Sequence, residues 1–261
     1  YSTIVMSTDS AVAWLLAEKY HGQKTPAFYA DCKRLALGEP LGYIIGWVPF
    51  LDTRIYLDSK PLIPRPETEY WTKEVLKTLT EQQTLALGLT PSEPIRVLDL
   101  CAGSGCIGVA IAAAVPHTHV TFAELDAAHL DTIARNCQEN GIPADRYTIV
   151  QSNCFSALPD TTFDLIVSNP PYVDQSLGRV ATSVSEHEPA LALYGGANGL
   201  ELITTIITAA PAHLQPGDAL WLEHEPEQVA AIHDLAQHAG FQCTTYPDQY
   251  AVHRYSILVV R

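Results

Sequence analysis

The chain carries few basic residues. Its 261 residues include 15 Lys and Arg against 29 Asp and Glu, which gives a formal net charge of −14. The densest basic stretch is Lys33-Arg34. A surface this acidic is repelled by bare phosphate backbones unless it hides a local basic patch. The composition therefore favours a protein or a small molecule as partner and predicts no nucleic-acid partner.

Long apolar runs and paired cysteines are also missing. No stretch approaches the roughly 18–20 apolar residues that cross a bilayer, so we expect no membrane partner. The six cysteines contain no CxxC pair, and the acidic run at 223–227 lacks the HExxH spacing, so we expect no metal. Reduced thiols predict a cytoplasmic location. An organelle matrix is the alternative, because the chain starts at Tyr1 and not at Met.

From Ile95 onward, short apolar runs alternate with segments of helical periodicity. The alternation predicts an α/β fold whose mostly parallel sheet has helices on both faces. No helix separates the last two strands, so they should pair antiparallel. The expected strands are 95–100, 120–125, 147–151, 163–168, 219–224, 241–246 and 255–260, and the expected helices are 106–115, 127–140, 199–214 and 226–239.

The first 94 residues have a different pattern. Apolar residues at helical spacing predict helices over 11–19 and 27–37, and a helix over 67–87 follows a proline-rich stretch. Two β-rich runs, 43–47 and 54–57, predict a hairpin. We therefore expect a short helical substrate-recognition element at 1–42, a β-hairpin linker at 43–60 and the main domain at 61–261.

A glycine-rich turn, Gly103-x-Gly105-x-x-Gly108, follows the first strand of the main domain. Such a turn lets a ligand approach the backbone and the N–H groups of the next helix. Glu124 ends the following strand, where a carboxylate can accept ribose hydroxyls. The spacing also fits the dinucleotide fingerprint. Asp99 favours S-adenosyl-L-methionine, because an acid there would repel a pyrophosphate but suits the amino-acid end of a methionine-derived cofactor.

The second motif, Asn169-Pro170-Pro171-Tyr172, follows the strand at 163–168 and should lie beside the glycine turn. An amide nitrogen is a poor nucleophile because its lone pair is delocalised. The Asn169 oxygen and the Pro170 carbonyl can each accept one N–H and aim such a nitrogen at a methyl donor. The two prolines preorganise that backbone, and Tyr172 can stack on a flat amide or base. The motif predicts methyl transfer to a planar amide-type nitrogen.

Together these residues resemble the HemK-like release factor glutamine N5-methyltransferases. The resemblance runs from about Gly38 onward and includes the stretches 38–46 and 62–69, the glycine turn, the Asn-Pro-Pro-Tyr motif and Glu223-His224. Leu-Ile-Pro-Arg-Pro-Glu-Thr-Glu at 62–69 is its most family-specific part. The resemblance implies a class I, Rossmann-like methyltransferase with a seven-stranded sheet. It also implies S-adenosyl-L-methionine as cofactor and the Gly-Gly-Gln loop of a peptide chain release factor as substrate.

The resemblance assigns site residues by position. Glu124 takes the place of the ribose-binding acid, and Asn153 and Cys154 lie at the adenine edge. The expected cofactor-binding residues are Asp99, Cys101, Ala102, Gly103, Ser104, Gly105, Glu124, Asn153, Cys154 and Asn169. The expected catalytic residues are Asn169, Pro170, Pro171 and Tyr172, and the same four bind the substrate together with Arg65 and Glu67.

The sequence departs from the family pattern at four cofactor positions. Cys101 replaces a glycine, Glu124 and Asn153 each replace an Asp, and Cys154 replaces a bulky aromatic. An adenine-N6 methyltransferase acting on DNA or RNA is the main alternative, because a nucleobase amino group suits the same motif. A catalytically silent cofactor-binding protein and a dinucleotide oxidoreductase are further alternatives.

Overall fold

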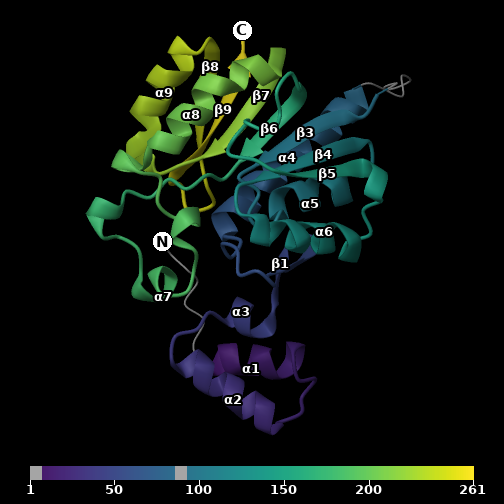
Figure 1. Ribbon diagram of the computed structural model, residues 1–261, viewed down its shortest axis with the longest axis vertical. Coiled ribbons are helices and arrows are strands. Elements are labelled where there is room, and N and C mark those ends of the chain that lie inside the picture. Colours follow the sequence, from purple (N-terminus) through teal and green to yellow (C-terminus); the bar gives the residue numbers. More distant parts are fainter. Residues whose placement is uncertain (1–7, 86–92) are drawn as a thin grey trace.

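A seven-stranded sheet runs through the part of the chain that the computed structural model describes, residues 8–85 and 93–261 (Figure 1). Its strand order is β5-β4-β3-β6-β7-β9-β8. Strands β3 to β7 pair in parallel, whereas β9 runs antiparallel to both of its neighbours. The mostly parallel sheet and the antiparallel last pair confirm the prediction. The strands are β3 (Ile95–Leu100), β4 (Thr118–Glu124), β5 (Tyr147–Gln151), β6 (Phe163–Ser168), β7 (Leu214–Glu223), β8 (Phe241–Pro247) and β9 (His253–Val260).

Helices cover both faces of this sheet (Figure 1). Successive strand residues point to opposite faces. Val97 accordingly packs in the core under α4, α5 and α6, whereas Leu98 packs in the core under α8 and α9. These helices are α4 (Pro66–Leu85), α5 (Cys106–Ala114), α6 (Leu130–Glu139), α8 (Glu201–Ala209) and α9 (Val229–His238). The short helices between them are η1 (Ala127–His129), η2 (Ala144–Arg146), η3 (Gln175–Leu177), α7 (Thr182–Ser185), η4 (Ala190–Ala192), η5 (Ala197–Gly199), η6 (Ala210–His213) and η7 (Pro226–Gln228).

The N-terminal helices form a small unit with its own core. They are α1 (Thr8–Glu18), α2 (Pro26–Ala36) and α3 (Leu41–Ile45), and Figure 1 shows them below the sheet domain. Leu15, Phe28 and Ile44 fill the core of the unit. The buried Asp31 of α2 accepts hydrogen bonds from Lys19, Tyr20 and Arg34. The helical element is therefore held by both apolar packing and one buried carboxylate.

The hairpin predicted at 43–47 and 54–57 begins later than expected. Its strands are β1 (Trp47–Phe50) and β2 (Thr53–Tyr56), whereas Tyr43–Ile45 belongs to α3. Gly46 ends that helix with a left-handed φ of 97°. Ile44 is needed in the small N-terminal core, and the Tyr43 hydroxyl donates to the Pro61 carbonyl at 2.7 Å. Tertiary packing here overrides the β propensity of the Tyr-Ile-Ile run.

Other predicted boundaries differ most from the structure between residues 199 and 219. The helix expected over 199–214 is α8 followed by η6, and β7 begins at Leu214 instead of Ala219. Pro211 lies within η6, where its missing N–H cannot continue an α-helix. The predicted end of the helix at 67–87 lies outside the described residues. No helix within residues 8–85 and 93–261 is both long and apolar enough to cross a membrane.

Two asparagines of α6 attach the hairpin to the sheet domain. The Asn136 side chain accepts from the Tyr56 N–H at 2.7 Å and donates to the Tyr56 carbonyl at 3.1 Å. Its nitrogen also donates to the Ser104 carbonyl at 2.9 Å, inside the glycine turn. One turn later, Asn140 makes the same pair of bonds to the backbone of Arg54. Each primary amide thus satisfies one N–H and one C=O on the free edge of β2.

We expect Asn136→Ala to lower the free energy of unfolding by about 2–4 kcal/mol, because it leaves several buried backbone groups without partners. The Asn136 side chain is fully buried, whereas Asn140 is partly exposed. Asn140→Ala is therefore the matched control and should cost less than about 1 kcal/mol, since water can replace its bonds. Urea denaturation of both variants measures the difference, and equal losses would contradict this account of the attachment.

Candidate active site

The glycine turn after β3 adopts left-handed backbone at three positions. The φ angles are 61° at Cys101, 57° at Gly103 and 76° at Gly105. A glycine at position 101 would adopt that angle without strain, so Cys101 costs conformational energy there. A Cβ at Gly103 would meet no heavy atom within 4 Å, so this residue borders open space. The turn leaves room for a ligand to lie directly against its backbone.

Gly105 and Gly108 serve packing instead. Gly105 caps the start of α5, and a Cβ at Gly108 would lie 2.4 Å from the ring of Phe122. The Gly108 N–H donates to Asp99 Oδ2 at 2.9 Å. Asp99 is 1% exposed, and its Oδ1 has no hydrogen-bond partner among residues 8–85 and 93–261. Neither Asp99 nor Gly105, both expected to bind cofactor, lines the cavity beside the turn.

This cavity opens at the carboxyl edge of the sheet, where ligands of open α/β folds bind. The four residues from Cys101 to Ser104 form one wall, and Glu124 forms another. Glu124 accepts from the N–H groups of Gly103 at 2.7 Å and Asp126 at 2.8 Å. A carboxylate has about four acceptor sites, so two remain for a ligand. The open space at Gly103 and these acceptors fit the sugar and methionine parts of S-adenosyl-L-methionine.

The two residues predicted to lie at the adenine edge have small side chains. Asn153 and Cys154 both line it, and Leu125 lines it from the end of β4. Phe155, the adjacent aromatic, does not reach the cavity, because its ring stacks on His213 at 4.4 Å between centroids. Burial raises the pKa of the Cys154 thiol. Cys154 is thus a neutral apolar wall and not a nucleophile.

The Asn-Pro-Pro-Tyr motif separates this cavity from a smaller hollow. Asn169 and Pro171 line the larger cavity. Asn169 also lines the hollow, together with Pro170 and Tyr172. The structure therefore brings together all four residues predicted to be catalytic. Asn169 lies where the two spaces meet.

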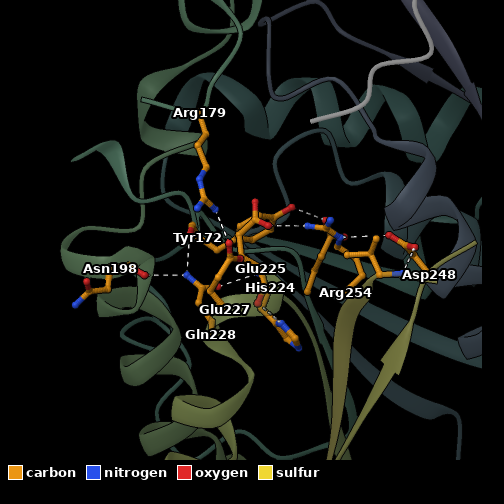
Figure 2. A network of polar contacts seen from close by, with 11 residues as sticks. Tyr172, Arg179, Asn198, His224, Glu225, Glu227, Gln228, Asp248 and Arg254 are labelled. Carbon is orange, nitrogen blue, oxygen red and sulfur yellow. Dashed lines mark hydrogen bonds and ion pairs between the residues drawn. The ribbon is translucent and has the colours of Figure 1, made fainter. Parts of the chain in front are cut away.

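Gln228 and the segment 195–199 fix the backbone of the Asn-Pro-Pro-Tyr motif. Gln228 donates to the Tyr172 carbonyl at 2.8 Å and to the Asn198 carbonyl at 3.0 Å (Figure 2). A Cβ at Gly195 would lie 2.4 Å from the Pro171 oxygen, and one at Gly199 would lie 1.9 Å from the Tyr172 oxygen. No side chain fits at these two glycines. The segment 195–199 thus fixes the motif's carbonyl groups at close range.

Of the two substrate residues expected outside the motif, only Arg65 reaches the hollow. Arg65 lines it, but its guanidinium donates to Glu188 at 2.7 Å. Glu188 also accepts from the Ile63 N–H at 3.0 Å. Glu67 lines neither space, whereas Thr68, the next residue, lines the larger cavity. The ion pair ties the proline-rich stretch to the 182–195 loop, of which Pro189 and Ala192 line the cavity.

Sequence reasoning missed the contacts beneath the motif. Asn169 donates to the Thr68 hydroxyl, which donates to Glu223, the last residue of β7. Trp71 and Tyr172 donate to the same carboxylate. Thr68 lies in the first turn of α4, and Glu223 ends a buried strand. The family resemblance includes both positions but does not indicate that they are in contact. Within the described ranges, no group of three or more His, Cys, Asp and Glu residues could hold a metal ion.

Comparison with known proteins agrees with this geometry. The model of the methyltransferase small domain matches residues 80–187. A release factor glutamine methyltransferase of Xylella fastidiosa is 36% identical over 243 residues, which cover 91% of this chain and 83% of that protein. A second, from Rhodopirellula baltica, is 37% identical and covers 82% of this chain and 71% of its own length. A ribosomal protein uL3 glutamine methyltransferase of Bordetella pertussis is 36% identical over 75% of this chain and 64% of its own.

Solved structures of low sequence identity show the same fold. The catalytic domain of hMettl16, in complex with a 3'UTR hairpin, superimposes with a TM-score of 0.60 at 14% identity and covers 96% of this chain and 91% of that one. A delta-N METTL16 methyltransferase domain gives a TM-score of 0.55 at 16% identity, covering 97% and 96%. These likenesses confirm the predicted class I methyltransferase fold.

The buried Asp99 should leave a signature in the pH dependence of stability. Burial, assisted by the nearby charge of Glu124, raises its pKa to about 7. Between about pH 4 and 7 the folded state then holds a proton that the unfolded state releases, so the free energy of unfolding falls as pH rises. We expect Asp99→Asn to remove this fall, which has a limiting slope of about 1.4 kcal/mol per pH unit.

Urea titrations at several pH values measure that slope. Asp131→Asn, at an exposed position of α6, is the control and should keep the wild-type pH dependence. Parallel curves for wild type and Asp99→Asn would contradict the prediction.

Proposed function

Because the chain belongs to the family of release factor glutamine methyltransferases, we propose that it methylates a peptide chain release factor. The acceptor is the side-chain amide nitrogen, N5, of the glutamine in the Gly-Gly-Gln loop. The methyl donor is S-adenosyl-L-methionine. Such a reaction modifies a factor of translation termination.

One observation carries this proposal: Asn169 lies between two spaces of different size. The larger is bordered by the glycine turn and Glu124 and takes the cofactor. The smaller lies beside Pro170 and Tyr172, and the flat end of the glutamine side chain is proposed to enter there. An amide placed in the hollow would have its nitrogen beside Asn169 and facing the larger cavity. This arrangement brings donor and acceptor together at one residue.

The chain's own residues supply orientation and acceptors. The Asn169 oxygen and the Pro170 carbonyl each accept one N–H of the substrate amide, which fixes the plane of the amide. The ring of Tyr172 covers one side of the hollow and packs on that plane. Because prolines and close glycines hold the backbone, these groups are in place before the substrate arrives. The acceleration therefore comes from preorganised electrostatics and proximity.

The cofactor is held along the turn. Residues 101–104 take its methionine part, Glu124 its ribose, and Asn153 and Cys154 its adenine. Bound S-adenosyl-L-methionine would supply a sulfonium methyl group to the amide nitrogen and leave as S-adenosylhomocysteine. The Asn169 oxygen and the Pro170 carbonyl accept the two N–H groups before transfer. The nitrogen then loses one of these protons to water, and the neutral N-methyl amide keeps a single N–H for one of the two acceptors.

The nucleobase alternative is not favoured. An adenine amino group suits the same motif, but the chain carries a net charge of −14. A polyanionic substrate would be repelled by such a surface. The release factor is the proposed partner, without nucleic acid, membrane or metal. The cytoplasmic location stays a prediction.

Methyl-labelled S-adenosyl-L-methionine with a purified release factor tests the proposal. We expect label on the wild-type factor and none on a Gly-Gly-Ala variant of its loop. Asn169→Ala in the enzyme should lower kcat by about 100-fold or more, because it removes an acceptor aimed at the reacting nitrogen. Label on ribosomal protein uL3 alone would redirect the proposal to another protein glutamine. Label on duplex DNA or transfer RNA alone would establish the nucleobase alternative.

The adenine edge yields a gain-of-function prediction. Asn153→Asp offers a charged acceptor to the adenine amino group and should tighten S-adenosyl-L-methionine binding by about 3- to 10-fold. A hydrogen bond to a charged acceptor contributes about 1 kcal/mol more than one to a neutral amide oxygen. Gln138→Glu, exposed on α6, adds the same charge away from the cavity and should leave Kd unchanged. Calorimetry compares the two, and equal affinities would show that Asn153 does not face the base.

A further inference from the structure

Glu223 is a buried carboxylate that no part of the proposed reaction uses directly. It ends β7 and is 1% exposed. It accepts hydrogen bonds from the Thr68 hydroxyl at 2.7 Å, the Trp71 indole nitrogen at 2.6 Å and the Tyr172 hydroxyl at 2.8 Å. An indole N–H can only donate, so the carboxylate acts as an acceptor in this cluster. Burying such a group is costly unless hydrogen bonds compensate, and here three donors do so.

The acceptor role of Glu223 fixes the hydroxyl of Thr68. A threonine hydroxyl has a single proton, and this one is directed to Glu223. Toward Asn169, 3.0 Å away, the Thr68 oxygen can then only accept. Asn169 must therefore present its nitrogen to Thr68. Its oxygen, on the other arm of the same planar amide, is left for the substrate.

The opposite orientation of Asn169 would be unproductive. It would present an NH2 group to the NH2 group of the substrate glutamine, and two donors cannot form a hydrogen bond. Nothing in the shape of an asparagine side chain distinguishes the two orientations, because oxygen and nitrogen are nearly the same size. Selection between them has to come from a partner with a defined donor or acceptor role. The chain from Glu223 through Thr68 provides that partner.

We infer that Thr68 and Glu223 are positioning residues for methyl transfer, which hold the Asn169 oxygen toward the acceptor nitrogen. The inference rests on the proposed function for the identity of the acceptor. Tyr172, on the other side of the hollow, donates to the same carboxylate. The Glu223 carboxylate thereby orients both the Asn169 oxygen, through Thr68, and the ring of Tyr172. Neither Thr68 nor Glu223 needs to touch the substrate amide.

Substitutions at Thr68 separate orientation from folding. Thr68→Val keeps the shape and removes the hydroxyl, whereas Thr68→Ser keeps the hydroxyl. The matched control is Thr72→Val, one turn along α4, where the fully buried Thr72 hydroxyl donates only to the Thr68 carbonyl among the contacts described. We expect Thr68→Val to lower kcat by about 10- to 100-fold, the scale of losing one oriented contact in the transition state.

Cofactor affinity and the kcat of the other two variants distinguish a lost orientation of Asn169 from a general disruption of the fold. Kd for S-adenosyl-L-methionine should stay within about twofold of wild type in all three variants. Thr68 lines the larger cavity, but valine and serine nearly keep its shape there, and the glycine turn is untouched. Thr68→Ser should restore most of kcat, and Thr72→Val should leave it within about twofold. An unchanged kcat in Thr68→Val, or an equal loss in Thr72→Val, would overturn the inference.

An NMR measurement on the enzyme without substrate tests the orientation of Asn169 independently of which substrate is methylated. The side-chain amide resonances of Asn169, assigned by their loss in Asn169→Ala, report the hydrogen bond to Thr68. We expect them to shift in Thr68→Val and in Glu223→Gln and to return in Thr68→Ser. Absence of methylation by the wild-type enzyme would refute the proposed function alone. Unmoved resonances in Thr68→Val would refute the positioning role alone.

Discussion

The site depends on one tertiary constraint, the junction of α4 with the carboxyl edge of the sheet at Glu223. That carboxylate joins the first turns of α4, the end of β7 and the segment that follows β6. These three segments are far apart in sequence, and a single buried acceptor sets their spacing. The low dielectric around Glu223 strengthens each of its bonds and makes any missing donor expensive. The geometry of the active site therefore depends on the packing of α4 against the sheet.

The proline-rich stretch before α4 has a second attachment on the opposite side of the site. Glu188 binds both the Arg65 guanidinium and the Ile63 N–H, and its side chain is 1% exposed. The 182–195 loop and the 62–65 stretch are thereby held to each other across the hollow. A family-specific sequence of this kind looks like a binding motif when it is read alone. In the structure, most of its polar groups bind other parts of the chain.

The sequence allowed the sheet, the order of its elements and the glycine turn to be predicted, because these rest on local periodicity and on backbone requirements. Asn169 to Tyr172 were predicted for the same reason, since their chemistry is contained in four consecutive residues. Glu67 was predicted to bind the substrate, whereas Thr68 is the residue that lines the cavity. The exact start of α4 decides which of these two side chains faces the cavity, and no sequence pattern marks that start. The roles of Glu188 and Glu223 depend on contacts with residues more than 100 positions away. No local rule supplies such pairs.

Asn136 and Asn140 bind the hairpin only through its main chain. Their amides recognise peptide groups and are indifferent to the side chains of β2. The asparagine bonds at positions 54 and 56 require only a backbone N–H and C=O, which every residue except proline provides. The connection between the N-terminal helices and the sheet domain can thus persist while the surface of the hairpin changes. A hairpin of another sequence would keep this connection as long as it presents its main chain to the two amides of α6.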